Sequence, residues 1–159
     1  AMRVQNAKRK IEQTRNTMQE IQQALLGFVT VNGYLPCPAN NPKIGKDMCP
    51  PAIPPPVPTL PWMTLGTQGL DPWGHPYEYW VTTDFTDTLT FPAGVGDLIV
   101  QNAAGAELFS LPVPNRVAVL LFSYGPNGRQ DAFTAPRTFR MGSSDDILLW
   151  IPIDILRYR

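Results

Sequence analysis

The chain has 159 residues, enough for one domain with a sizeable hydrophobic core. Lys and Arg number 13 and so do Asp and Glu, so the net charge is zero and no nucleic-acid partner is expected, because nucleic-acid binders usually carry a basic excess. One histidine and two cysteines cannot supply the four ligands of a structural zinc site.

Residues 1–33 predict one long helix. Apolar or small side chains recur there at alternating steps of three and four residues, which gathers them into one narrow stripe. The stripe consists of Val4, Ala7, Ile11, Thr14, Met18, Ile21, Leu25 and Phe28. Asn32-Gly33 supplies a stop signal, since glycine readily adopts the left-handed conformation that follows a helix end. A helix of about 30 residues would be about 45 Å long. We therefore expect part of it to project beyond the domain that follows.

The two halves of the stripe are expected to have different partners. The half from Met18 to Phe28 should pack on the chain's own sheet, and the half from Val4 to Thr14 should contact another molecule. A coiled-coil seam is the alternative, but Ala7 and Thr14 lie on the seam and weaken it. The basic side chains between these positions are interpreted as a solvated helix face rather than a DNA-binding surface; they are Arg3, Lys8, Arg9, Lys10 and Arg15.

Residues 34–61 predict a long loop rich in proline. The prolines between positions 50 and 58 exclude helix and central strand and favour extended polyproline II. A proline-rich ligand for an aromatic groove is one reading. The flanking Leu60, Trp62 and Leu65 favour a loop packed onto the domain instead.

Cys37 and Cys49 both lie in this loop, which has little capacity to bury them. The alternatives are a disulfide and two exposed free thiols, and we predict the disulfide. Such a bond implies an oxidising compartment, and closing this short loop would stabilise the fold by about 2–3 kcal/mol.

Residues 62–159 predict a β-sheet domain. Asp71 to Pro76 reads as a tight turn, because two prolines and a glycine occupy turn positions. Strands are expected at 77–82, at 97–101 and 107–110 as a hairpin around 103–105, at 117–124, and at 146–150. The unbroken apolar run 117–124 predicts a central strand buried on both faces, and Pro152 should end the last strand or place it at an edge. One long helix followed by an antiparallel sheet is an α+β fold in one globular unit.

Four segments resemble the type IV pilins and the pseudopilins of type II secretion, in the family's order. They are the helix exit ending Asn32-Gly33-Tyr34-Leu35-Pro36, the turn Asp71-Pro72-Trp73-Gly74 with His75 in place of the usual asparagine, the turn Ser123-Tyr124-Gly125-Pro126-Asn127-Gly128, and the closing acidic Ser144-Asp145-Asp146-Ile147 before Trp150. The stretch 35–39 is similar to a minor-pilin branch. The family's basic leader and apolar first half of the helix are not in this sequence.

The resemblance implies a structural subunit, a minor pilin or pseudopilin, in a type IV pilus or a type II secretion-like filament. Its partners would be other pilin subunits. An apolar segment preceding residue 1 would anchor it in the inner membrane, facing the periplasm, before assembly. The alternative function is an exported surface-binding module that recognises a ligand through the 34–61 loop and the aromatics near Trp62 and Trp73.

The resemblance to pseudopilins also implies a calcium-holding loop between the last strands, because Ca²⁺ prefers oxygen ligands. The candidate ligands are Asp131, Asp145 and Asp146, with Asn127 and backbone carbonyls. Arg137 and Arg140 would oppose a cation, so solvated turn acids are the favoured alternative.

No catalytic or cofactor-binding residue is predicted, and we expect no enzymatic activity. His75 is the sole histidine and lies between turn residues, where no base–nucleophile pair is evident. Asp145 and Asp146 are neighbours in a predicted strand, so their side chains should point to opposite faces.

Overall fold

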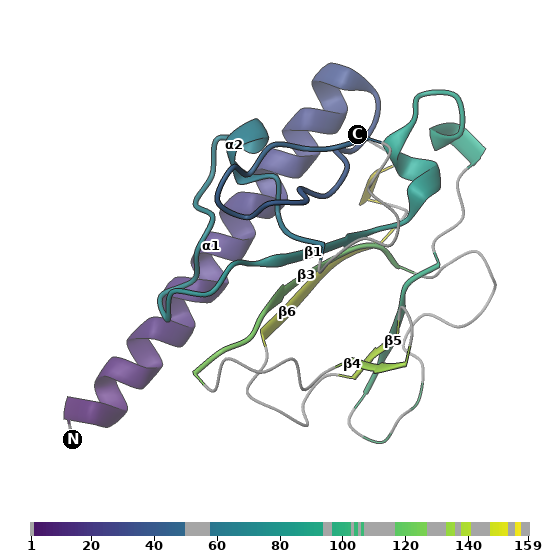
Figure 1. Cartoon of the computed structure of the whole chain (residues 1–159). Coiled ribbons are helices and arrows are strands. Elements are labelled where there is room, and N and C mark those ends of the chain that lie inside the picture. The colour runs from purple at the N-terminus through teal and green to yellow at the C-terminus, as the bar shows by residue number, and fades with distance from the viewer. Residues whose placement is uncertain are drawn as a thin grey trace.

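The computed structural model describes residues 2–49, 58–93, 97–102, 104, 106, 117–126, 133–135, 138–140, 147–152 and 155–156. The fold is α+β, as predicted, with one long N-terminal helix packed on an antiparallel sheet (Figure 1). The elements are α1 (Met2–Asn32), α2 (Trp62–Leu65), β1 (Glu78–Val81), the 3-10 turns η1 (Thr83–Thr86) and η2 (Phe91–Ala93), β2 (Ile99–Gln101), β3 (Val117–Ser123), β4 (Phe133–Ala135), β5 (Thr138–Arg140) and β6 (Ile147–Pro152).

Helix α1 ends where the sequence predicts. Gly33 has a φ of 81°, and its N–H donates to the Val29 carbonyl at 2.7 Å. The left-handed conformation costs glycine little and lets the chain leave the helix axis at once. The next residues then turn toward the sheet, where the Leu35 N–H donates to the Phe85 carbonyl at 2.7 Å.

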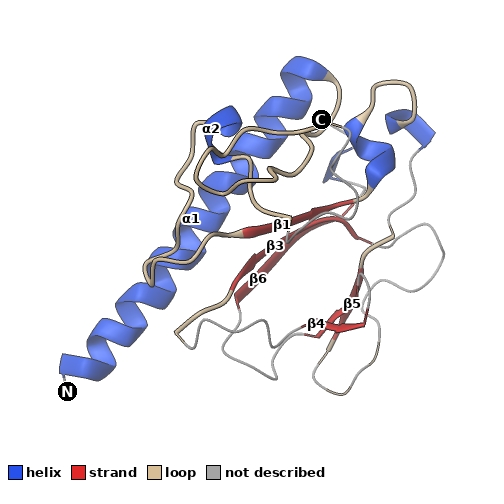
Figure 2. Cartoon of the chain, in the orientation of Figure 1, coloured by secondary structure: helices blue, strands red, loops and turns tan. Residues whose placement is uncertain are grey.

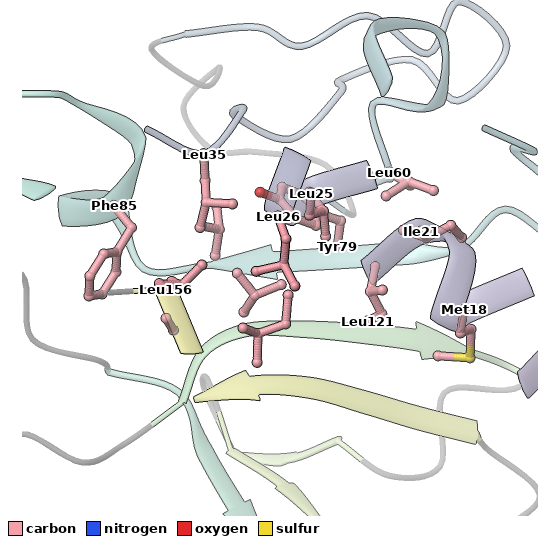
Figure 3. Packing of buried hydrophobic residues seen from close by; sticks show 14 of the residues in the cluster. Met18, Ile21, Leu25, Leu26, Leu35, Leu60, Tyr79, Phe85, Leu121 and Leu156 are labelled. Carbon is pink, nitrogen blue, oxygen red and sulfur yellow. The ribbon is translucent and has the colours of Figure 1, made fainter. Parts of the chain in front are cut away.

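The main core lies between α1 and the sheet β1-β3-β6. Met18, Ile21 and Leu25 are fully buried, and each stabilises the fold by about 1.5–3 kcal/mol. Figure 3 shows them gathered with residues of the strands and of the connecting loops, including Leu121 of β3 and Leu60. The packing expected for this half of the stripe is therefore confirmed for Met18, Ile21 and Leu25, whereas Phe28 packs edge-on against Tyr34.

Strand β3 is the central strand, and all seven of its residues are buried. Val119 and Leu121 belong to the core under α1, whereas Leu120 and Phe122 belong to a second cluster with Phe139 of β5. Neither face of β3 meets water, which explains its unbroken apolar sequence. β6 lies at the edge of its sheet and ends at Pro152, as predicted.

The outer side of β1 is occupied by the end of the long loop. The Tyr79 N–H donates to the Pro58 carbonyl at 3.0 Å, and the Leu60 N–H donates to the Tyr77 carbonyl at 3.0 Å. Thr59 also bridges back to Ala39, with its hydroxyl donating to the Ala39 carbonyl at 2.8 Å. Both described ends of the 34–61 loop are thus held against the sheet.

Two parts of the prediction need correction. Residues 62–65 form the short helix α2 rather than opening the β-rich region. β2 pairs in parallel with β5 in a second small sheet, β2-β5-β4, visible beside the main sheet in Figure 2. The expected hairpin partner of β2, residues 107–110, lies outside the described residues. Strand propensity marks a strand but does not choose its partner.

Candidate functional site

The N-terminal third of α1 is the candidate assembly surface. Residues 6–10 are all exposed, Ile11 is half-buried, and Thr14 is completely buried. Figure 1 shows this end of α1 extending past the sheet. The projection expected from the helix length is therefore present. The side chain of Val4 lies outside the description.

Burial along α1 begins earlier than the sequence suggested. Thr14 was placed in the half that faces another molecule, but it is enclosed by this chain. Its hydroxyl donates to the Lys10 carbonyl at 2.7 Å, which satisfies the polar group and makes its burial inexpensive. Of the described stripe residues, Ala7 and Ile11 are the ones left to a partner at this end, whereas Met18, Ile21 and Leu25 are used by the core and Phe28 packs edge-on against Tyr34.

A buried carboxylate holds the turn that opens the sheet. Asp71 is 5% exposed, and its Oδ1 accepts the backbone N–H groups of Trp73 at 3.0 Å and His75 at 2.9 Å. Its Oδ2 accepts the hydroxyl of Ser123, at the end of β3, at 2.8 Å. Ser123 in turn accepts the N–H of Gly125 at 3.3 Å. The turn at Asp71 and the turn that follows β3, whose bonded residues are 52 positions apart, are therefore joined by one side-chain hydrogen bond.

This cluster contains Ser, His and Asp but not in a catalytic order. A triad needs the imidazole between the carboxylate and the nucleophile. Here Ser123 donates directly to Asp71, and His75 Nδ1 lies 3.7 Å from Asp71 Oδ1 on the other side. Ser123 is also fully buried. The geometry is that of a structural link between a turn and a central strand.

Two buried tyrosines lie in β1 and just before it. Burial, followed by the negative charge of Asp71, raises the pKa of Tyr77 from 10.0 to about 12, while the nearby side chain of Thr17 in α1 opposes the rise. Burial also raises the pKa of Tyr79 well above its usual value, with a smaller effect from Asp47. The Tyr79 hydroxyl donates to the Pro36 carbonyl at 2.8 Å, which fixes the start of the long loop.

The predicted disulfide is present between Cys37 and Cys49, with a Cα–Cα distance of 5.6 Å. The loop that it closes is attached to α2. The Met63 N–H donates to the Gly45 carbonyl at 2.8 Å, and the Asp47 N–H donates to the Thr64 hydroxyl at 3.0 Å. The disulfide loop and α2 therefore form one hydrogen-bonded unit.

Trp62 joins this unit to the turn that precedes β1. Its indole N–H donates to the Pro42 carbonyl at 2.7 Å. A Cβ at Gly69 would lie 2.6 Å from Trp62 Cδ1, and a Cβ at Gly45 would collide with the same ring. The indole thus lies between Gly45 and Gly69, and it fits there because neither residue has a side chain. The sequence showed these residues but gave no sign that they touch.

A surface groove of about 780 Å³ runs along the exposed edge of Trp62. Pro42 and Lys43 of the disulfide loop border one side, and Leu70 and Pro76 border the other. Leu70 is 53% exposed. The groove is therefore bordered by the disulfide loop and by Trp62, two of the features through which the predicted surface-binding module would recognise a ligand.

The predicted calcium ligands Asp131, Asp145 and Asp146, with Asn127, lie outside the described residues. Within the part of the chain that the structure describes, no group of three or more His, Cys, Asp or Glu side chains is placed to hold a metal ion. Nor does any helix in that part combine the length and apolar content needed to cross a bilayer.

Comparisons of this chain with protein-family models, with curated proteins and with solved structures found no match. Its function has to be inferred from its own residues and their geometry.

Proposed function

We propose that the chain is a structural subunit of a pilin-like filament, a minor pilin or pseudopilin, that assembles through the exposed part of α1. The observation that carries this proposal is the division of one 31-residue helix into a covered and an uncovered part. From Thr14 onward the helix contributes to the core, whereas residues 6–10 touch nothing that buries them.

A helical segment that packs against nothing has little stability of its own. Isolated short helices are marginal in water, and most helical stability comes from packing one face. Residues 6–10 gain stability from continuity with the buried half, but their apolar position Ala7 remains open. A neighbouring subunit lying along α1 would cover Ala7 and the exposed side of Ile11.

The link between Asp71 and Ser123 supports the resemblance on which the proposal draws. The two turns were compared with the family separately, yet in the fold they are hydrogen-bonded neighbours. The Cys37–Cys49 disulfide is in keeping with an exported protein. The subunit would be anchored in the inner membrane by an apolar segment upstream of residue 1, face the periplasm, and then enter a pilus or a secretion pseudopilus. It would catalyse no reaction.

The proposal is tested in the natural full-length protein. Replacing Ala7 by Glu places a charge on the uncovered face without disturbing the core. We expect A7E to reduce the amount of this protein in sheared filaments at least about tenfold, while the thermal midpoint of the soluble domain stays unchanged. Gln19→Glu, an exposed change elsewhere on α1, is the matched control and should assemble normally.

Two results would contradict the proposal. One is incorporation of A7E at the level of the unchanged protein. The other is a natural upstream sequence that is an ordinary cleaved signal peptide, instead of a short basic leader followed by about 20 apolar residues.

The groove beside Trp62 favours a second candidate function, adhesion to a ligand on another surface. A half-buried indole next to aliphatic side chains is a surface against which apolar groups of a ligand can pack. Saturable binding of the soluble domain to a glycan or peptide array should then be lost in Leu70→Ala. It should be kept in Met63→Ala, a comparably exposed apolar change outside the groove. Equal binding by both variants would rule out the groove.

A further inference from the structure

The zero net charge hides a strong separation of charge along the chain. Residues 3–15 contain five basic residues and one acidic residue, Glu12. No Lys or Arg occurs between Lys46 and Arg116, a stretch that contains seven acidic residues. They are Asp47, Asp71, Glu78, Asp84, Asp87, Asp97 and Glu107. The chain therefore has no net charge, but its first residues are mostly basic and its middle part is acidic.

The basic charges lie at the projecting end of α1. Lys8, Arg9 and Lys10 are exposed on consecutive positions, and none of them forms an ion pair within the described residues. We refer to Lys8, Arg9 and Lys10 as the basic helix end.

Two exposed acidic charges that lie close together in the chain are at the opposite end of α1. Asp84 and Asp87, in and after η1, are both exposed and form no ion pair in the described part of the chain. A Cβ at Gly33, just past the last residue of α1, would lie 3.7 Å from the neighbouring Thr88 side chain. Figure 1 shows η1 and η2 beside this end of the helix.

Two exposed apolar side chains accompany these acids. Val31, in the last turn of α1, is 84% exposed, and Leu89, two residues after Asp87, is 88% exposed. The partial negative charge of the helix C-terminus adds to that of the carboxylates. We refer to Val31, Asp84, Asp87 and Leu89 as the acidic corner.

The two clusters are too far apart to neutralise each other within one molecule. Lys10 and Gly33 are separated by 23 helical residues, or about 35 Å at 1.5 Å per residue. That distance is several times the screening length of about 8 Å at physiological salt. Each cluster is therefore available to a complementary surface on another molecule.

We propose that the complementary surface is a second copy of this chain, with the basic helix end of one molecule bound to the acidic corner of the next. The acidic corner also brings two exposed apolar side chains, Val31 and Leu89. A contact between two different patches repeats from copy to copy and produces an open filament unless the rotation closes a ring. This inference rests on the proposed function and deepens it by naming the partner surface.

The contact is weak on its own. Exposed ion pairs contribute little individually and are screened by salt. Subunits already held along α1 in a filament would form it at high effective concentration. A solution test must therefore trap the encounter rather than rely on stable dimers.

A zero-length carbodiimide joins a lysine amine to a carboxylate only where the two are in contact. We expect concentrated wild-type domain at low salt to give links from Lys8 or Lys10 to Asp84 or Asp87, identified by mass spectrometry. The separation along α1 excludes such a link within one molecule. The yield should fall at least about fivefold at 1 M salt, where the screening length is about 3 Å.

Two charge-reversed variants provide the matched control. In K8E/R9E/K10E both ends are acidic, and in D84K/D87K both ends are basic, so neither variant alone should form linked dimers. Their mixture restores opposite charges at both kinds of contact and should form linked dimers again. All substituted side chains are exposed, so circular dichroism and the thermal midpoint should match the wild type.

Absence of these links in the wild type, or equal yields from each variant alone and from the mixture, would overturn the inference. If that happens while A7E still blocks filament incorporation, the filament proposal stands and only the head-to-tail contact fails. If the links form as expected but A7E enters filaments normally, the head-to-tail contact stands and assembly through the uncovered face of α1 fails.

Discussion

Removing the carboxylate of Asp71 should be among the most destabilising changes available in this fold. Asp71→Ala deletes the acceptor of three hydrogen bonds, two from backbone N–H groups and one from the Ser123 hydroxyl. A buried donor left without an acceptor costs about 1–3 kcal/mol. The N–H groups of Trp73 and His75 are in half-buried residues that water can partly reach, whereas Ser123 is fully buried. We expect a total loss of about 3–5 kcal/mol in the free energy of unfolding.

Two milder variants separate the contributions. Asp71→Asn keeps Oδ1 as an acceptor for the backbone groups, and its amide can donate to the rotatable Ser123 hydroxyl, so about 1–2 kcal/mol should be lost. Ser123→Ala removes one donor and should cost about 1–3 kcal/mol. Because both residues share one bond, the double variant D71A/S123A should be less destabilised than the sum of the singles by about 1–2 kcal/mol.

The assay is urea unfolding at neutral pH with the disulfide intact, followed by tryptophan fluorescence and linear extrapolation. Asp84 is an exposed carboxylate that forms no ion pair with another described residue, so Asp84→Ala is the control and should change stability by less than about 0.5 kcal/mol. A loss below about 1 kcal/mol in D71A, or strict additivity in the double variant, would refute the role given to this link.

Three further predictions concern other contacts of the fold. Reducing the disulfide, whose cysteines are 12 residues apart, should lower stability by about 3 kcal/mol, and an unchanged urea midpoint with reductant would contradict this. The folded-state pKa of Tyr77, about 12, exceeds its usual 10.0, so its stabilisation is complete below pH 10 and should be lost toward pH 12 at about 1.4 kcal/mol per unit. Urea midpoints at alkaline pH should therefore fall less steeply in Tyr77→Phe than in the wild type. Gly69→Ala should cost about 1–3 kcal/mol through its clash with Trp62, whereas Gly27→Ala, where an added Cβ meets nothing within 4 Å, should stabilise α1 by about 0.5–1 kcal/mol in thermal or urea unfolding.

The elements that the sequence predicted correctly are those whose burial or turn pattern is visible in a short run of consecutive residues. The central strand β3 is apolar from Val117 to Phe122 because α1 covers one face and the β5 side chain Phe139 helps to cover the other. The end of α1 is marked by Gly33, which the left-handed conformation requires. The turn at Asp71 was recognisable because its prolines restrict the backbone and Gly74 permits a positive φ.

The contacts that could not be predicted from the sequence join residues that are distant in the chain. Nothing near Asp71 indicates that its second oxygen binds Ser123, because that pairing exists only after β3 has been placed. The packing of Trp62 between Gly45 and Gly69 has the same origin. Thr14 was misplaced for a different reason, since a hydroxyl that bonds its own helix can be buried like an apolar group.

The same limits apply to the candidate assembly surface. The stripe identified the apolar side of α1. The residue at which α1 loses contact with its own domain depends instead on how far the other segments of the chain extend along the helix. The segment after α2 extends along the helix, and Gly66 and Gln68 border the same hollow as Thr17 and Ala24. The uncovered surface is consequently shorter than the periodicity suggested.

Occupation of the outer side of β1 by Pro58, Thr59 and Leu60 restricts how the molecule can polymerise. An open strand edge invites backbone pairing with a foreign strand, the route to amyloid-like fibres. Here the N–H of Tyr79 already has a partner in the Pro58 carbonyl, and a proline has no N–H with which to extend the ladder. Addition of a further strand is blocked at this edge of the sheet. A polymer that formed there would be held together by side-chain contacts and could therefore dissociate.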